Sequence, residues 1–134
     1  MAAEFIWPLR VYYEDTDHGG VVYHANYVKF MERARTEWLR SKGFEQDSLI
    51  KEQGLLFAVR DMQMKFHIPA RFNDALEVSA EVVKYGRASL DFHQQVRRGS
   101  ELLCEATVRI ASLDSKSFKP KMMNQALLTT MAEE

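Results

Sequence analysis

Residues 26–42 read NYVKFMERARTEWLRSK, and apolar side chains recur in this stretch every three or four positions. That spacing places them on one face of a helix, while charged residues cover much of the remainder. Asn26 is expected to cap the helix N-terminus and Gly43 to end the helix. No other long helix is strongly predicted. The apolar face is expected to pack as core and comprises Tyr27, Phe30, Met31, Ala34, Trp38 and Leu39.

Strand patterns occupy most of the remaining chain. Residues 7–13 alternate apolar and polar side chains before the helix. After the helix the alternation resumes, and a change of phase near Arg60 and Asp61 predicts a β-bulge. Turns are expected at Gly86 and Gly99. The predicted order of one strand, one long helix and a four-strand meander is typical of an α+β domain with an antiparallel sheet packed on the helix.

Length and composition favour a single soluble domain over residues 1–134. The formal net charge is −1, so no overall positive field predicts a nucleic-acid partner. The single cysteine, Cys104, cannot form an intrachain disulfide. No secretory leader and no transmembrane segment are recognised. The expected location is therefore cytoplasmic.

Residues 12–27 read YYEDTDHGGVVYHANY and join the first strand to the helix. A carboxylate beside glycines at a helix entry can activate water or attack a carbonyl, and free amides at the helix start can polarise that carbonyl. Asp17 is the candidate, although an aspartate in this setting also commonly closes an Asx-turn. No Gly-x-Ser-x-Gly elbow is present, which argues against a serine hydrolase. The histidines and aspartates lack a recognised metal-ligand spacing, so no metal is expected.

This segment resembles the signature of the 4-hydroxybenzoyl-CoA thioesterase family, and most closely its YbgC branch, which is associated with the Tol–Pal system. Residues 32–37 (ERARTE) and 69–71 (PAR) extend the resemblance. It implies a hotdog fold, in which an antiparallel sheet wraps on one long central helix. It also implies a homodimer formed edge to edge, often a homotetramer, and hydrolysis of acyl-CoA without a cofactor. The implied role of Asp17 is nucleophile or general base, with the backbone amide around His24 contacting the thioester oxygen.

The resemblance also directs attention to substrate-binding residues. His24 is expected to act in catalysis or in orienting the substrate, the alternative being that it only satisfies backbone groups at the helix start. Tyr23 is expected to form pocket wall or core, and Gly20 to let the backbone approach the substrate. Arg87, and secondarily Arg71, are expected to meet the phosphates of coenzyme A. Some members of the helix stripe are expected to border the acyl chain. The acyl group is expected to be short or small.

Four further expectations complete the interpretation. Asp15 is expected to be structural, and residues 115–134 are expected to form a loosely packed terminal segment. The main alternative function is a non-catalytic module that binds acyl-CoA or acyl-carrier protein for an envelope-associated complex, placed peripherally at the inner membrane. A hotdog dehydratase is a third hypothesis, because fold alone does not give function, but the Asp17 motif argues against it.

Overall fold

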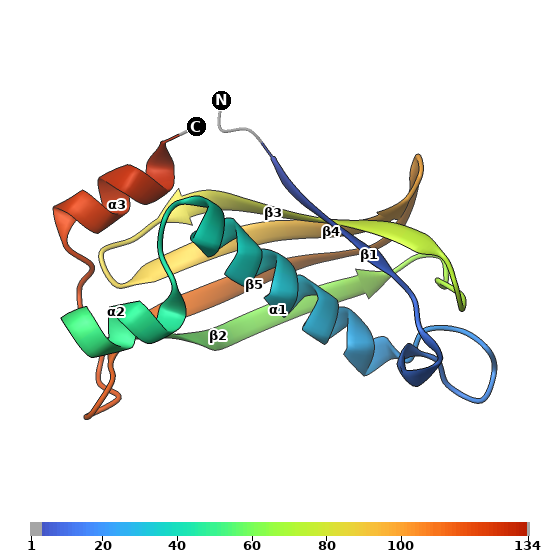
Figure 1. Cartoon of the computed structure of the whole chain (residues 1–134), viewed down its shortest axis with the longest axis horizontal. Coiled ribbons are helices and arrows are strands. Elements are labelled where there is room, and N and C mark those ends of the chain that lie inside the picture. The colour runs from blue at the N-terminus through green and yellow to red at the C-terminus, as the bar shows by residue number, and fades with distance from the viewer. Residues whose placement is uncertain (1–3, 134) are drawn as a thin grey trace.

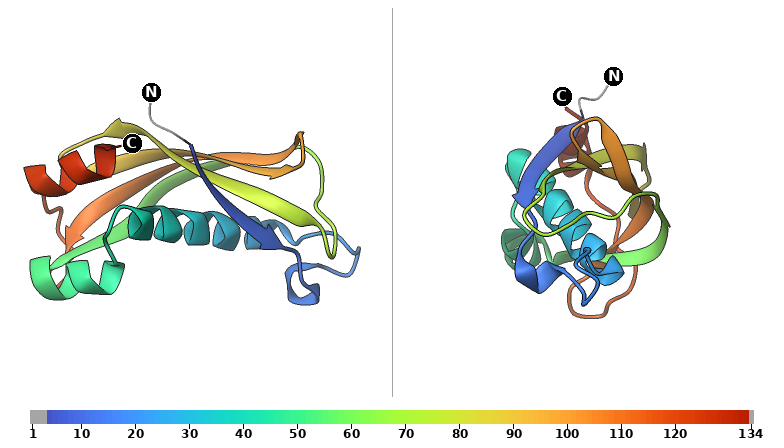
Figure 2. Two further views of the ribbon diagram at one scale, coloured as in Figure 1. Left: turned by 45° about the horizontal axis from the view of Figure 1, so that its top comes forward. Right: turned by 90° about the vertical axis from the view of Figure 1, so that its right-hand side faces the viewer.

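One long helix and a five-stranded antiparallel sheet form most of the computed structural model, which describes residues 4–133 (Figure 1). The strands are β1 (Phe5–Arg10), β2 (Leu55–Phe66), β3 (Ala75–Tyr85), β4 (Ser89–Arg98) and β5 (Glu101–Asp114). The helices are α1 (His24–Ser41), α2 (Gln46–Gln53) and α3 (Gln125–Ala132), and a 3₁₀ turn covers Tyr13–Asp15. The expected α+β hotdog arrangement is confirmed: the sheet curves around α1, which lies along its concave face (Figure 2).

The helix α1 buries the face that its sequence period predicts. All six apolar positions of the stripe are buried against the sheet, with Phe30, Met31 and Ala34 at 1% exposure or less. Facing them are the inward side chains of the sheet, including Val78, Ala80, Phe92, Val96 and Val108. This interface removes a large apolar area from water, which is the main stabilising contribution in a domain of this size.

The boundaries of α1 correct one expectation and confirm another. The helix begins at His24, with Tyr23 in the N-cap position, so the prediction that Asn26 caps the helix is wrong. Asn26 lies inside the first turn, and its side-chain amide donates to Asp15 Oδ1 at 2.9 Å. The asparagine therefore serves a neighbouring carboxylate. Gly43 follows the helix end with φ of 91°, a left-handed conformation that glycine adopts readily, as predicted for the terminator.

The strand order is β1-β3-β4-β5-β2, and every neighbouring pair is antiparallel. The predicted four-strand meander is therefore wrong for β2, which pairs with β5 at the edge of the sheet. Only β3, β4 and β5 follow one another as hairpins. Residues 67–74 are long enough to cross the open end of the sheet, so β2 and β3 need not be neighbours. The predicted bulge is confirmed by a register shift between Val59 and Asp61.

The end of the first strand and the packing of the C-terminal segment differ from the sequence interpretation. The first strand ends at Arg10 and not at Tyr13, because the chain enters the 3₁₀ turn that Asp15 holds. The tail is not loosely packed: Met123, Leu127 and Met131 are buried. The side chain of Asn124 accepts from the Leu127 amide at 2.8 Å and caps α3. Within residues 4–133, no helix is both long and apolar enough to cross a membrane.

Candidate active site

The segment between the 3₁₀ turn and α1 is a tight, hydrogen-bonded loop. Thr16 and Val22 form an isolated antiparallel bridge. Inside it, the Asp17 amide donates to the Val21 carbonyl at 2.8 Å, and the Gly20 amide donates to the Asp17 carbonyl at 3.0 Å. Gly20 has φ of 80°, which the turn requires and which few other residues adopt without strain. The loop thus fixes the backbone of Asp17 close to the start of α1.

The Asp17 carboxylate is exposed, and only one of its oxygens is engaged within the described chain. Oδ1 accepts from the Gly19 amide at 2.8 Å, which is an Asx-turn. Oδ2 accepts no hydrogen bond from residues 4–133 and is open to a substrate or water. A Cβ at position 19 would lie 3.2 Å from Oδ1, so a larger residue there would crowd this carboxylate. Asp17 is therefore held in orientation through one oxygen while the other remains available.

Asp15, two residues earlier, meets the opposite environment. It is buried, and its oxygens accept from the Tyr12 amide and from the Asn26 side chain, both at 2.9 Å. Its backbone carbonyl also accepts from the Tyr23 amide at 2.9 Å. These contacts tie the 3₁₀ turn to the first turn of α1. The geometry fits the expectation that Asp15 is a structural residue.

The first turn of α1, which follows the Asp17 loop directly, has backbone amides without an acceptor in the described chain. The Asn26 amide donates to the Tyr23 carbonyl at 2.8 Å, whereas the His24 and Ala25 amides donate to no acceptor within residues 4–133. Such amides carry the positive end of the helix dipole and can polarise a carbonyl. The exposed His24 ring lies 4.5 Å from the Tyr23 ring and 6.4 Å from that of Phe66, measured between centroids.

The connection from β2 to β3, residues 67–74, packs against this loop. Val21 pairs with Arg71 in an isolated bridge, and the Val22 amide donates to the Ala70 carbonyl at 2.8 Å. Asp74 holds the connection by accepting from the Arg71 amide at 2.8 Å and from Arg98 Nη1 at 2.7 Å. Partial burial acts to raise the pKa of Asp74, but these hydrogen bonds outweigh it and the pKa is lowered.

The expected site residues fall into two groups in space. Asp17, Gly20, Tyr23 and His24 lie on one loop and helix start, and Arg71 joins them through its bridge to Val21. Arg87 lies in the β3–β4 turn beside α3, at the opposite end of the sheet (Figures 1 and 2). The separation is the length of β3, eleven residues, or about 36 Å. Within one chain, Arg87 is therefore not part of the Asp17 site.

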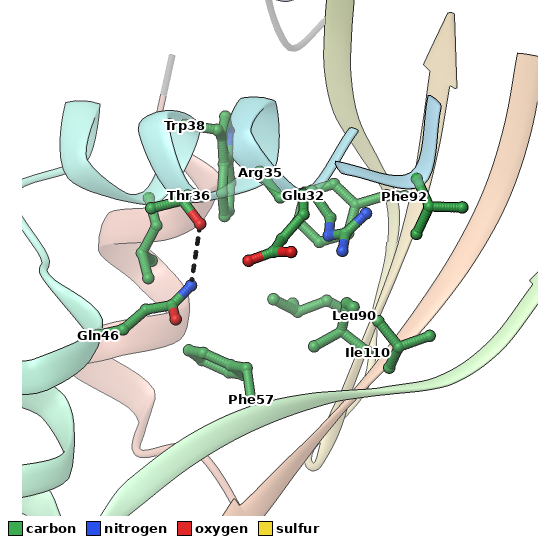
Figure 3. Close-up of a pocket in the computed structure, with 12 residues that line it drawn as sticks. Glu32, Arg35, Thr36, Trp38, Gln46, Phe57, Leu90, Phe92 and Ile110 are labelled. Carbon is green, nitrogen blue, oxygen red and sulfur yellow. Dashed lines mark hydrogen bonds between the residues drawn. The ribbon is translucent and has the colours of Figure 1, made fainter. Parts of the chain in front are cut away.

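A cavity of about 210 Å³ between α1 and the sheet was not predicted as a site (Figure 3). Its floor is apolar and buried, and is formed by Trp38, Leu39, Leu90, Phe92 and Ile110. Its mouth is exposed and opens between α1 and β2, at Val28, Glu32, Gln46 and Val59. The helix stripe contributes Trp38 and Leu39, the only signal in the sequence that pointed here. Among the described residues, no three His, Cys, Asp or Glu side chains are grouped to hold a metal ion.

Comparison with known proteins identifies the family. The model of the thioesterase superfamily matches residues 19–105. A YbgC acyl-CoA thioesterase of Haemophilus influenzae is 46% identical over 87% of this chain and 85% of its own length. A YbgC acyl-CoA thioester hydrolase of Escherichia coli is 46% identical over 92% of both chains. The crystal structure of a probable thioesterase from Bartonella henselae, 35% identical, superposes with a TM-score of 0.87 over 91% of this chain and all of that one. With the fold and the loop geometry in agreement, this chain belongs to the thioesterase superfamily.

Proposed function

We propose that this protein hydrolyses the thioester of acyl-CoA substrates, with Asp17 as the catalytic carboxylate. The observation that carries the proposal is the free Oδ2 of Asp17 in the loop that leads into α1, whose first two amides, those of His24 and Ala25, have no acceptor within residues 4–133. The YbgC relatives named above, which are acyl-CoA thioesterases, support the same reaction class. The products are the free acid and coenzyme A.

Two routes are consistent with this geometry, and both place the thioester carbonyl at the helix amides. In one, Asp17 attacks the carbonyl carbon, the thiolate of coenzyme A leaves, and water then hydrolyses the acyl-aspartyl anhydride. In the other, Asp17 takes a proton from water as the water attacks, and the thiolate leaves with that proton. The amides of His24 and Ala25 stabilise the oxyanion in either route.

The neighbouring residues have supporting roles in this proposal. The His24 ring, exposed beside Tyr23, orients the water or the substrate, and Tyr23 forms one wall of the approach. Gly20, with no side chain, leaves the backbone open to the substrate.

We assign the phosphates of coenzyme A to Arg87, with Arg71 as a second contact. The separation of Arg87 from Asp17 within one chain is resolved if two chains pair through β2, the long free edge of the sheet. A two-fold axis that pairs two such edges antiparallel reverses one sheet relative to the other. The Arg87 turn of one chain then lies at the same end as the Asp17 loop of its partner.

Assembly and location follow the same line of argument. We propose a homodimer or homotetramer in the cytoplasm, with active sites at the subunit boundaries. Acyl-carrier protein is a further acyl donor consistent with this site. A peripheral place at the inner membrane, with the Tol–Pal system, rests on the YbgC resemblance alone.

A non-catalytic binding module is the second candidate function, and the Asx-turn at Asp17 is the observation that favours it. A thiol-release assay on a panel of acyl-CoA thioesters distinguishes the two functions. Catalysis gives stoichiometric free thiol with turnover. A binding module gives none, although it retains a thioether analogue that cannot be hydrolysed.

The substitution Asp17→Asn tests the proposed catalytic role. Asparagine keeps the shape and the acceptor of the Asx-turn but is neither a base nor a competent nucleophile. We expect normal folding, retained acyl-CoA binding and a loss in kcat of about 10²- to 10⁴-fold. The measurements are kcat and the thermal melting temperature on one good substrate.

The matched control is Asp15→Asn, the same substitution in the same loop. Because Asp15 is buried and accepts two hydrogen bonds, this variant is expected to melt at a lower temperature and to lose less activity per folded molecule. The catalytic assignment is wrong if Asp17→Asn retains more than about a tenth of the wild-type kcat, given that general-base loss costs at least ~10²-fold.

A further inference from the structure

The cavity beneath α1 contains a charged side chain that the proposed reaction does not use. Arg35 projects from the buried face of α1, is 8% exposed and borders the cavity. Figure 3 shows its guanidinium and the carboxylate of Glu32 entering the same space above Leu90 and Phe57. Glu32 is exposed and stands at the mouth of the cavity, whereas Arg35 is buried. The charge inside the cavity is therefore that of Arg35.

The guanidinium of Arg35 is largely unpaired. Of its five N–H donors, one hydrogen bond is made within residues 4–133, from Nη1 to Gln94 Oε1 at 2.9 Å. No carboxylate of the described chain lies within 4.0 Å of it. No enclosed side-chain nitrogen or oxygen in that part of the chain lacks a partner. The remaining donors of Arg35 are therefore not sealed in the core, and the cavity is the space they meet.

A structural link between α1 and β4 does not require this charge. Gln94 already joins the two elements, because its amide donates to the Met31 carbonyl at 3.0 Å and to the Ser79 carbonyl at 3.1 Å. Burial lowers the pKa of Arg35, and the nearby charge of Glu32 opposes that shift. A buried cation without an anionic partner is unfavourable unless something else satisfies it. An acceptor oxygen brought by a ligand meets this requirement.

We propose that the cavity receives the acyl group of the substrate, and that Arg35 selects acyl groups bearing an acceptor oxygen at the end remote from the thioester. The proposal rests on the acyl-CoA thioesterase function above. A volume of about 210 Å³ is below the roughly 300–1,000 Å³ of a pocket for a whole drug-sized ligand, so it suits part of a molecule. The apolar floor holds the acyl chain, and the free N–H groups of Arg35 donate to a carboxylate, hydroxyl or carbonyl oxygen of the ligand.

Arg35 is a specificity-determining residue in this proposal and not a catalytic one. It lies eleven residues beyond His24 on α1, about 16 Å along the helix axis. An acetyl group held at Asp17 of the same chain cannot reach it. The experiment must therefore vary the length of the acyl group to find the one that brings an oxygen to Arg35.

The test compares matched acyl-CoA thioesters of six, eight and ten carbons: the saturated acyl group, its terminal hydroxyl analogue and its terminal carboxylate analogue. In at least one length, we expect the wild-type protein to prefer an oxygenated substrate in kcat/KM. The two oxygenated series separate a neutral acceptor from an anion. In Arg35→Met we expect this preference to fall about 10- to 100-fold, the range for a hydrogen bond to a charged group.

Arg33→Met is the matched control, since Arg33 is an exposed arginine of the same helix outside the cavity. It is expected to leave the preference unchanged. Arg35→Lys keeps the charge and part of the donor set, and is expected to retain part of the preference. If Arg35→Met does not fold, Arg35→Lys and the wild-type comparison decide the question.

Equal kcat/KM for saturated and oxygenated substrates at all three lengths would overturn the inference and leave the thioesterase function intact. A uniform loss in Arg35→Met, with the preference unchanged, would also overturn it and make Arg35 structural. Absence of thiol release from every substrate would instead contradict the proposed function. Binding of alkyl-CoA thioethers, with and without a terminal hydroxyl, needs no turnover and decides the inference in that case.

Discussion

Two carboxylates separated by one residue have different environments in this chain, and the sequence alone indicated which was which. Asp15 was expected to be structural and is buried under two hydrogen bonds. Asp17 was expected at the helix entry with glycines beside it and lies there, exposed. The distinction was accessible because the Asp-x-Asp-x-Gly-Gly pattern and the family resemblance both depend on local spacing. The catalytic role of Asp17 stays a prediction.

Residues whose partners are distant in sequence were not accessible in the same way. Asn26 is a residue type that commonly caps helices, but its side chain donates to a carboxylate eleven positions earlier. Arg35 is a charged residue outside the apolar stripe of the helix sequence, yet it is buried and bonds Gln94, 59 positions away. Gln94 occupies an inward strand position normally held by an apolar residue and is fully buried. Each depends on tertiary packing, which local propensity does not encode.

At residue scale, Asp74 is expected to couple pH to stability. Its pKa is lowered in the folded protein, so the charged form stabilises the fold above the ordinary pKa of 3.8, and this contribution is lost as pH falls through the folded pKa. Asp74→Asn removes it. We expect the melting temperature of the variant to lie below that of wild type at neutral pH, and the gap to narrow below pH 3.8. Thermal melts of both proteins across this range provide the measurement.

Asp91→Asn is the control, because Asp91 is also a carboxylate with a lowered pKa but lies elsewhere in the fold. Asp91 on β4 accepts a hydrogen bond from Arg109 on β5 at 2.8 Å, which lowers the pKa of Asp91. This pair lies away from the connection that holds Arg71. Both variants should show the same pH trend in stability. Only Asp74→Asn should raise KM for acyl-CoA, because Asp74 holds the backbone of Arg71, the proposed second contact to coenzyme A. A melting gap that widens on acidification would contradict the sign of the predicted shift.

At element scale, periodicity predicted the long helix and the alternation of the strands after it, because both depend on neighbours along the chain. The bulge in β2 was visible for the same reason. The pairing of β2 with β5 was not, since pairing depends on where residues 67–74 lead the chain. The helix α3 was missed even though Met123, Leu127 and Met131 recur every four residues, because its short length resembles an unstructured end.

The β3–β4 turn is expected to bind the nucleotide through Arg87. Arg87→Ala should raise KM for acyl-CoA with a smaller change in kcat, because the contact is remote from the thioester. The effect should be absent with simple pantetheine thioesters, which lack the nucleotide. Steady-state kinetics on both substrate types provide the test. Equal increases in KM would mean that Arg87 acts through structure, for example through its carbonyl, which accepts from the Met123 amide at 2.8 Å.

At the scale of the whole molecule, the sheet has two free edges, β1 and β2, and β2 is the longer. Unpaired edges of this kind favour association. We expect a homodimer or homotetramer by light scattering at micromolar concentration. If active sites lie at subunit boundaries, specific activity should fall on dilution together with the mass. A stable monomer with full activity would contradict this assembly.

The bulge in β2 determines which substitutions and single-codon deletions this strand tolerates. On either side of it, Val59 pairs with Ile110 and Met62 pairs with Val108, so the bulge absorbs one extra residue and leaves both positions on the same face of the sheet. The exposed side chain of Arg60 makes no hydrogen bond within the described chain, so its chemical identity matters little to the fold. The bulge absorbs this residue, so the alternation of the strand does not depend on it. Missense changes at codon 60 should therefore be tolerated, and an in-frame deletion of that codon should leave Met62 and Met64 on the inner face of a regular strand. Deletion of codon 63 would instead make Met62 and Met64 consecutive, so one of them must turn outward, and accumulation of folded protein should fall.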